Sequence, residues 1–314
     1  MPMHLVAMSH SPLLDKVDVP ELVRAELEVV FESLRKVVSA FAPDVVVLFT
    51  PDHYNGFFYD IMPPFCIGTA AEAIGDFESA AGSLNVPDDL AEELARFVLS
   101  RDVDVALSRA MHVDHGAVQP LEILFGGIES IPVIPVFVNG VAEPFAPMTR
   151  VGTLGRAIGE FFADRPERVL VLASGGLSHD PPVPQWATAP SPLRKAILDG
   201  RNRTPAARAE REARVFATAR DFAQGTATIQ DLNPSWDREF MSLCRSGRLE
   251  ELESYSSEQM TSDAGHSSHE VRTWVAAFAA QASISPYEIG IEFYKPIREY
   301  IAGFGVMTAT SSSR

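Results

Sequence analysis

The stretch Asp44–Phe58, DVVVLFTPDHYNGFF, decides how the rest of the sequence is interpreted. It opens with a continuous apolar run, Val45–Phe49, which is typical of a strand buried on both faces of a sheet. A Thr-Pro pair ends the run, and Asp52 and His53 follow directly. In open α/β sheets, ligands bind just beyond the carboxyl ends of the strands. The stretch therefore predicts a central strand that delivers an imidazole to a functional edge.

Three further predicted strands are also followed by a histidine. Neutral imidazole is the commonest metal ligand among side chains and changes its charge nearest neutral pH. One histidine after a strand is usually structural, but four on the same sheet edge indicate a shared site. The pairs of strand and histidine are His4–Met8 with His10, Val103–Leu107 with His115, and Arg168–Ala173 with His179.

Helical periodicity separates these strands along the chain. Strands that alternate with helices predict an α/β fold with a mainly parallel or mixed central sheet and helices on both faces. No repeat or linker interrupts the pattern, so residues 1–314 are expected to form a single large catalytic domain with its site at the C-terminal ends of the strands. The expected helices are Pro20–Phe41, Asp88–Ser100, Val118–Phe125, Val151–Ala163, several between Leu193 and Gln259, and one from Val271 to about Ala282.

Three further strand candidates complete the predicted sheet. Ile131–Asn139 is apolar, but Pro132 and Pro135 lack backbone donors, which predicts an edge or irregular strand. The tail supplies two more strands, Tyr287–Tyr294 and Ile301–Ala309.

Composition excludes several classes of function. The chain has 26 lysines and arginines against 42 aspartates and glutamates, a net charge of −16, which disfavours nucleic-acid binding. Two cysteines make no disulfide framework, which indicates a reducing compartment. No apolar run approaches the roughly 20 residues of a membrane span, and the N-terminus does not resemble a signal peptide. We expect a cytoplasmic protein that binds neither nucleic acid nor membrane.

The residue types at the predicted edge are suited to metal chemistry. Two histidines and one carboxylate leave about three positions open on an octahedral metal, and non-haem Fe(II) oxygenases use this arrangement to hold substrate and dioxygen together. Zinc hydrolases use similar ligands, so residue type alone leaves the metal open.

Several motifs resemble one known family over essentially the whole chain. The sequence is similar to the type III (LigB-like) extradiol catechol dioxygenases. The run from Pro51 to Gly68 is the most specific of the motifs. The motifs that carry the resemblance are SHSPL, PDHYNGFFYDIMPPFCIG, VDHG, GGLSHDPPVP and SSHEVRTWVAAFAA.

The resemblance implies a role for each of five residues. His10, His53 and Glu270 would bind Fe(II), and His115 and His179 would act as an acid–base pair. From the residues alone, Glu270 has a competing interpretation, because Ser267 followed three residues later by Glu270 also matches a helix-capping pattern.

The resemblance also favours a substrate. It implies that dioxygen cleaves 3-(2,3-dihydroxyphenyl)propionate, and the corresponding cinnamate, beside the two hydroxyls to 2-hydroxy-6-oxonona-2,4-diene-1,9-dioate. A homo-oligomer, a tetramer or larger, is expected. An arginine should receive the substrate carboxylate, and the segment Gln185–Gln230 offers Arg194, Arg201 and Arg203 among others.

Residues beside the motifs have both functional and structural interpretations. Asp52 and Asp114 could orient histidines or bound turns. His112, His266 and His269 could support the site from behind, whereas His4 is expected to be structural. The aromatic residues that could line a ring pocket or pack in the core are Tyr54, Phe57, Phe58 and Phe65.

Two hypotheses from other classes remain at this point. One is a zinc- or manganese-dependent hydrolase with the same ligands. The other is a non-enzymatic scaffold that keeps the pocket for a protein partner, although retention of all five motif residues weighs against it.

Overall fold

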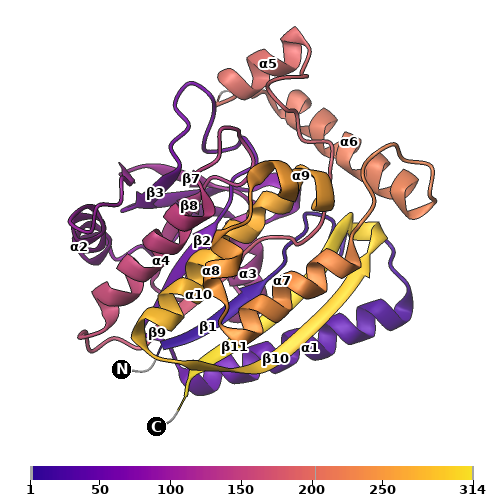
Figure 1. The fold of residues 1–314 in the computed structure, drawn as a ribbon. Coiled ribbons are helices and arrows are strands. Elements are labelled where there is room, and N and C mark those ends of the chain that lie inside the picture. The colour runs from indigo at the N-terminus through magenta and orange to yellow at the C-terminus, as the bar shows by residue number, and fades with distance from the viewer. Residues whose placement is uncertain (1–2, 202, 313–314) are drawn as a thin grey trace.

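A mixed sheet of eight strands forms the centre of the computed structural model, which describes residues 3–201 and 203–312 (Figure 1). The strand order is β10-β11-β1-β9-β2-β8-β3-β6. Its four central strands are parallel, so their carboxyl ends share one edge. These strands are β1 (Met3–Met8), β9 (Val169–Ser174), β2 (Val45–Thr50) and β8 (Val133–Val138).

Antiparallel strands extend the parallel centre on both sides. On one side β11 (Ala302–Ser311) pairs with β1, and β10 (Tyr287–Ile297) lies outside it. On the other side β3 (Phe65–Gly68) pairs antiparallel with β8 and parallel with β6 (Ala106–Ser108). A second, three-stranded sheet contains β5 (Ala81–Ser83), β4 (Ala71–Ile74) and β7 (Met111–Val113). The predicted α/β fold with a mixed sheet is confirmed.

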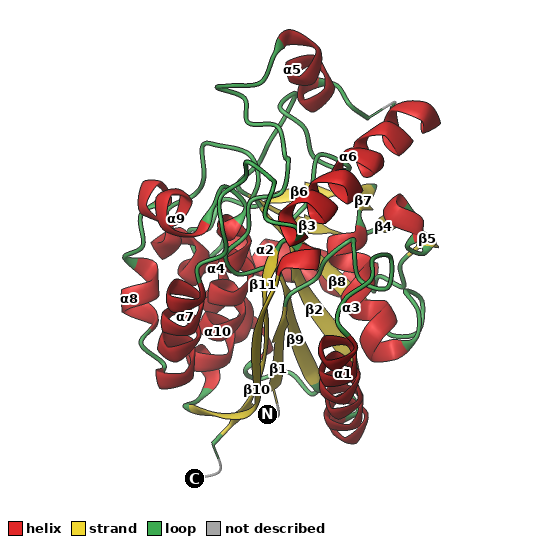
Figure 2. Ribbon diagram, turned by 90° about the vertical axis from the view of Figure 1, so that its right-hand side faces the viewer, coloured by secondary structure: helices red, strands yellow, loops and turns green. Residues whose placement is uncertain are grey.

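Helices cover both faces because every central strand is apolar on both. In β2, Val45, Val47 and Phe49 belong to one core cluster, and Val46 and Leu48 belong to the other. This alternation is the period of two that a strand imposes. Figure 2 shows the two helical layers on opposite sides of the sheet. The first includes α2 (Asp88–Leu99), α4 (Met148–Phe162), α7 (Pro234–Ser246), α8 (Leu249–Glu253), α9 (Ser257–Ala264) and α10 (Arg272–Ile284), and the second includes α1 (Glu21–Phe41) and α3 (His115–Phe125).

A glycine allows α4 and α10 to pack unusually close together. A Cβ added at Gly155 would lie 2.0 Å from the carbonyl oxygen of Ala276 on α10. The contact matters for function because the turn that precedes α10 carries Glu270.

Two helices lie beyond the carboxyl ends of the central strands. They are α5 (Ser191–Leu198) and α6 (Pro205–Ala223), and both views place them at the end of the molecule opposite the N-terminus (Figures 1 and 2). They confirm the prediction of several helices after Leu193. Among the described residues, no helix is both long enough and apolar enough to cross a membrane.

The predicted edge position of the strand around Pro135 is wrong. β8 lies inside the sheet, between β2 and β3. Its pairing with β3 covers only Val136 to Val138 and stops at Pro135, which lies beside Gly68 but has no N–H to donate.

Several predicted element boundaries differ from the structure, and two of them lie beside His115 or the strand expected before it. The strand expected at Val103–Leu107 is replaced by β6, which begins only at Ala106. The helix expected from Val118 begins at His115, because the Asp114 carboxylate accepts a hydrogen bond from the Gly116 N–H and caps the first turn.

Candidate metal centre and active site

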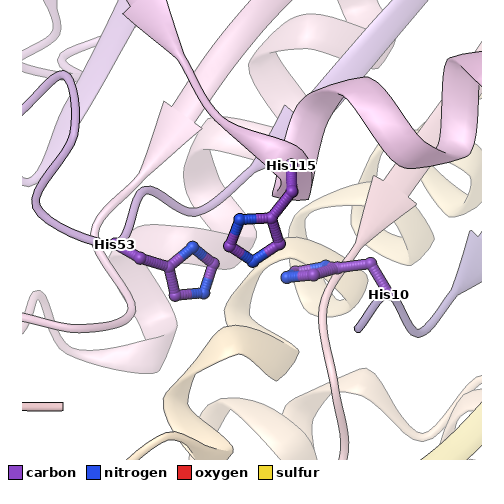
Figure 3. A group of neighbouring side chains, drawn as sticks. All are labelled: His10, His53 and His115. Carbon is purple, nitrogen blue, oxygen red and sulfur yellow. The ribbon is translucent and has the colours of Figure 1, made fainter. Parts of the chain in front are cut away.

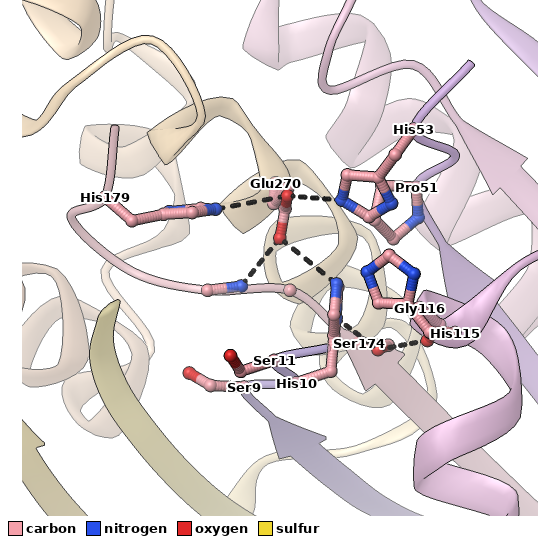
Figure 4. Close-up of polar contacts among 12 residues, drawn as sticks. Ser9, His10, Ser11, Pro51, His53, His115, Gly116, Ser174, His179 and Glu270 are labelled. Carbon is pink, nitrogen blue, oxygen red and sulfur yellow. Dashed lines mark hydrogen bonds and ion pairs between the residues drawn. The ribbon is translucent and has the colours of Figure 1, made fainter. Parts of the chain in front are cut away.

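Four histidines and one glutamate meet at the carboxyl edge of the parallel strands (Figure 4). All five are buried, with at most 9% of any of them exposed. Each comes from a segment that a strand or helix end holds in place. His10, His53 and His179 follow β1, β2 and β9, His115 is the first residue of α3, and Glu270 lies in the 3₁₀ turn Ser268–Val271.

The Glu270 carboxylate is the centre of this group. Its Oε1 lies 3.0 Å from His53 Nε2 and 3.1 Å from His179 Nε2. Its Oε2 lies 3.7 Å from His10 Nε2 and accepts a 2.9 Å hydrogen bond from the Gly176 N–H. One carboxylate therefore faces three imidazoles.

The backbone around Glu270 is fixed against the end of β9. A Cβ added at Gly175 would lie 2.6 Å from the Glu270 carbonyl oxygen, so only glycine permits this approach. The Trp274 indole donates to the Gly175 carbonyl at 3.0 Å, and the Thr273 hydroxyl donates to the Ser174 carbonyl at 2.9 Å. The capping interpretation of Glu270 is wrong, because Ser267 makes no side-chain cap and Glu270 points into the site.

Hydrogen bonds determine which ring nitrogen of His10 and of His53 carries the proton. The Ser174 hydroxyl donates its proton to the Gly116 carbonyl, so it must accept one from His10 Nδ1 at 2.9 Å. His53 Nδ1 lies 3.0 Å from Asp114 Oδ2, which is an acceptor only. Both Nδ1 atoms therefore carry a proton when the ring is neutral, and both Nε2 lone pairs face the common space.

The other two histidines are held in the same way. Asp76 Oδ2 lies 2.6 Å from His115 Nδ1, and the Leu177 carbonyl lies 2.8 Å from His179 Nδ1. Carboxylates or carbonyls behind an imidazole are the usual partners that fix its tautomer beside a metal.

The donor set fits a metal ion. Two ligand atoms at right angles, each about 2.1 Å from a metal, lie about 3.0 Å apart. The distance of 3.0 Å between His53 Nε2 and Glu270 Oε1 matches this value. Two lone pairs so close repel each other unless a proton or a cation lies between them. Donor atoms of His10, His53 and His115 also lie within 4.8 Å of one another, so His115 competes with Glu270 for the third ligand position (Figure 3).

The charges of Glu270 and His10 agree with a cation site, while His53 would have to release a proton, because Asp114 and Glu270 raise its pKa against the effect of burial. Burial would raise the pKa of the Glu270 carboxyl, but His179, His10 and His53 hold it well below its usual range. Burial lowers the pKa of His10 to about 3, so this ring is neutral. An anionic carboxylate and a neutral imidazole are the forms that bind metals.

A cavity with apolar walls opens above this group. It holds about 530 Å³ of space, counting the part open to solvent. Phe77 stands at its wall, with its ring centroid 5.2 Å from that of His115 at an angle of 74°. Apolar walls with a few convergent polar groups are typical of sites for small molecules, and these walls suit an aromatic ring. The lining includes Leu13, Phe77, Val183, Val215, Ile301 and Ala302.

Comparison with known proteins identifies the family. Residues 4–305 match the model of the catalytic LigB subunit of aromatic ring-opening dioxygenase. The chain belongs to the LigB family. A protein of Rhodococcus globerulus named 2,3-dihydroxyphenylpropionate/2,3-dihydroxicinnamic acid 1,2-dioxygenase is 56% identical over 97% of both chains. Proteins of the same name from Mycolicibacterium vanbaalenii and Escherichia coli O139:H28 are 52% and 48% identical, covering 98% or more of each chain.

A solved structure of the same fold is also similar. It is the crystal structure of an uncharacterised Escherichia coli K12 protein, with a TM-score of 0.51 and 14% identity over 97% of this chain and 99% of that one. As a LigB enzyme, the chain acts on an aromatic ring with dioxygen, and the family points to a metal cofactor.

Two aspartates hold histidines of the site in this LigB protein, and a third aspartate only closes a turn. Asp114 binds both the ring and the backbone N–H of His53 and also caps α3, so both of its predicted roles are present. Asp76, which the sequence motifs did not mark, does the same for His115. Asp52 only closes the turn after β2, through the N–H groups of residues 55–57.

The four aromatic residues that could line a ring pocket or pack in the core do the latter, and none of them lines the cavity. Tyr54 and Phe58 form a separate core cluster, Phe57 stacks on Phe137, and Phe65 packs in the main core. Phe77, which the sequence motifs did not mark, lines the cavity. Its φ of 48° is in the left-handed region, as is that of Tyr54 at 54°, and such strain in non-glycine residues gathers at functional sites.

The four other histidines do not line the cavity. His4 packs against Phe41, as expected for a structural residue, and His112 is exposed on β7. The last two, His266 and His269, are near Glu270 in the sequence but bind other residues. His266 pairs with Asp180, and His269 lies between Thr261 and Arg272.

Proposed function

We propose that the chain is an Fe(II)-dependent extradiol dioxygenase for 3-(2,3-dihydroxyphenyl)propionate and the corresponding cinnamate. It would use dioxygen to form 2-hydroxy-6-oxonona-2,4-diene-1,9-dioate and its cinnamate counterpart. The observation that carries the proposal is one carboxylate, Glu270, set among imidazole Nε2 atoms at the floor of an apolar cavity. The names of relatives that are 48–56% identical support the substrate.

In this proposal His10, His53 and Glu270 bind the iron on one face. Ferrous iron, when bound, supplies the transfer of electrons between catechol and dioxygen. Glu270 is preferred to His115 as the third ligand because its oxygen is 3.0 Å from His53 Nε2 and its pKa keeps it anionic. The family resemblance assigns His115 to proton transfer instead, with Asp76 holding its Nδ1.

His179 would take a proton from one catechol hydroxyl. Its Nδ1–H donates to the Leu177 carbonyl, which leaves Nε2 as the atom that accepts the proton. The neighbouring Glu270 carboxylate raises the pKa of His179 against the effect of burial, and therefore stabilises the protonated ring.

His115 would return a proton to the reacting oxygen. Asp76 holds Nδ1, so the proton that moves is the one on Nε2. Ring opening by dioxygen needs such a proton donor, and both atoms of dioxygen enter the product, so no external reductant is required.

Three further predictions concern the extent of the catalytic unit, its assembly and its location. We propose that residues 1–314 form one catalytic unit, since both core clusters share the same sheet. A homo-oligomer and a cytoplasmic location, the latter consistent with two buried free cysteines, stay predictions. Light scattering and fractionation would test them.

An oxygen electrode tests the proposed reaction. Protein loaded anaerobically with Fe(II) should consume one molecule of O₂ for each molecule of 3-(2,3-dihydroxyphenyl)propionate, and the solution should turn yellow. Protein loaded with Zn(II) is the control and should consume none. Ester or amide hydrolysis by the Zn(II) form, without oxygen uptake by the Fe(II) form, would favour the hydrolase. Failure to bind any metal would favour the scaffold.

A further inference from the structure

One positive charge lies in the wall of the active-site cavity. Among the described residues that line this cavity, Arg211 is the one lysine or arginine. It comes from the middle of α6, and Val215 lies one turn further along the same face. The helix therefore offers an apolar contact and a cation side by side, at the end of the sheet where the four histidines meet.

Arg211 is held in place by the loop that carries a predicted iron ligand. One terminal nitrogen donates to Asn55 Oδ1 at 3.0 Å, and the other donates to the carbonyl of His53. A guanidinium has five N–H groups. No further hydrogen bond or ion pair of Arg211 occurs within the described ranges, so the remaining donors can bind a ligand without losing the anchor.

The surroundings explain why a fixed cation is needed here. Asp52, Asp76 and Asp114 all lie near enough to act on the charge of Arg211. With Glu270 they make the site strongly acidic, in a chain of net charge −16. A substrate carboxylate entering this cavity would meet repulsion unless a cation received it.

The other arginines of the segment do not line this cavity. Arg194 stands over the Trp186 ring and bonds the Ala187 carbonyl. Arg201 pairs with Asp60. Arg203 and Arg214 line a neighbouring cavity behind Arg211, and Arg214 pairs with Glu210. None of these four lines the cavity of the histidines.

We propose that Arg211 receives the side-chain carboxylate of the substrate and makes the site selective for catechols with a short acidic chain beside the hydroxyls. The proposal rests on the function proposed above and names the residue that sets its substrate preference. The ring would lie between the histidines and the wall formed by Phe77 and Val215, with its chain directed along α6 toward the guanidinium.

The test compares two substrates in matched variants. The ratio of kcat/KM for 3-(2,3-dihydroxyphenyl)propionate to that for 3-ethylcatechol, which lacks the carboxylate, is measured in the Fe(II)-loaded full chain. In Arg211→Met this ratio should fall about tenfold or more, mainly through KM, because a hydrogen bond between charged groups is lost. In Arg214→Met, the control one turn away on α6, the ratio should stay that of the wild type.

A second measurement separates binding from support of the site. Anaerobic calorimetry follows 3-phenylpropionate, which carries the carboxylate but neither hydroxyl. Its affinity should fall in Arg211→Met and be partly restored in Arg211→Lys, which keeps the charge and loses the fork. If Arg211→Met does not fold, Arg211→Lys should still lower the kcat/KM ratio.

Three results overturn the inference. They are an unchanged kcat/KM ratio in Arg211→Met, an equal loss for both substrates, and unchanged affinity for 3-phenylpropionate. The equal loss would mean that Arg211 only supports Asn55 and His53. A wild-type protein that oxidises neither catechol would refute the proposed function instead, while the affinity for 3-phenylpropionate would still report on Arg211.

Discussion

At the scale of single residues, the site depends on where each imidazole is held. Asp114, Asp76, Ser174 and the Leu177 carbonyl each fix one Nδ1, and the Nε2 atoms converge on one space. Geometry alone leaves two candidates for the third metal ligand, Glu270 and His115. The first two predictions separate them.

Replacing Glu270 by Gln should strip iron from the folded protein. Gln keeps the shape and an acceptor for the Gly176 N–H but loses the negative charge that the metal needs. Iron per chain is measured by elemental analysis after desalting, with His115→Gln as the matched control that keeps its iron and loses turnover. Iron retained in Glu270→Gln and lost in His115→Gln would make His115 the ligand.

The two supporting aspartates should give opposite phenotypes. Asp114→Asn weakens the hydrogen bond to His53 Nδ1. Iron affinity should therefore fall about 10- to 100-fold, which is the usual effect of replacing a residue that orients a metal ligand. Asp76→Asn acts on His115, so kcat should fall while iron affinity stays near that of the wild type. Competition with a chelator and oxygen-uptake kinetics measure the two effects. Loss of iron in both variants would place His115 on the metal.

At the scale of elements, strand ends and helix starts bring distant residues together. β1, β2 and β9 deliver three histidines to one edge because they are adjacent and parallel. Glu270 reaches the same edge only because α10 packs closely against α4 and its first turn is tied to β9. The position of the glutamate therefore depends on helix packing.

Gly155→Ala should destabilise the protein by about 1–3 kcal/mol, as overpacking of a tight contact does. The added methyl would lie 2.0 Å from the Ala276 carbonyl oxygen and would force α4 away from α10. Urea unfolding monitored by circular dichroism measures the change. Thr153→Ala, on the less buried face of α4, is the control and should change the free energy of unfolding by about 0.5 kcal/mol or less. Equal stabilities would mean that the interface can relax.

At the scale of the whole molecule, the sequence predicted the layers and the meeting of five motif residues at one edge, and the roles of those residues stay predictions. Apolar runs of strand length indicate buried strands, and parallel strands end at one edge, so the sequence alone was enough to place His10, His53 and His179 together. Asp76, Phe77 and Arg211 could not be placed in this way. They lie in turns or on a polar helix outside any motif, and only tertiary packing brings them to the cavity. β8 was misplaced because the short pairing with β3 is invisible in its own sequence.

Metal binding should stabilise the whole fold, since the ligands come together only in the native state. Saturation at about 100 times the dissociation constant contributes about 2.7 kcal/mol to the free energy of unfolding. The melting temperature should therefore rise on anaerobic addition of Fe(II) and fall back after chelation, with a much smaller change in Glu270→Gln. The same rise in Glu270→Gln as in the wild type would mean that the ion binds elsewhere.

The most direct test of the central claim is the structure of the product formed under ¹⁸O₂. We predict that the Fe(II)-loaded protein converts 3-(2,3-dihydroxyphenyl)propionate to 2-hydroxy-6-oxonona-2,4-diene-1,9-dioate. NMR should show the cut beside the two hydroxyls, and mass spectrometry of promptly quenched samples should show both labelled atoms. A cut between the hydroxyls, or unchanged substrate in a protein whose iron content is complete, would contradict the account.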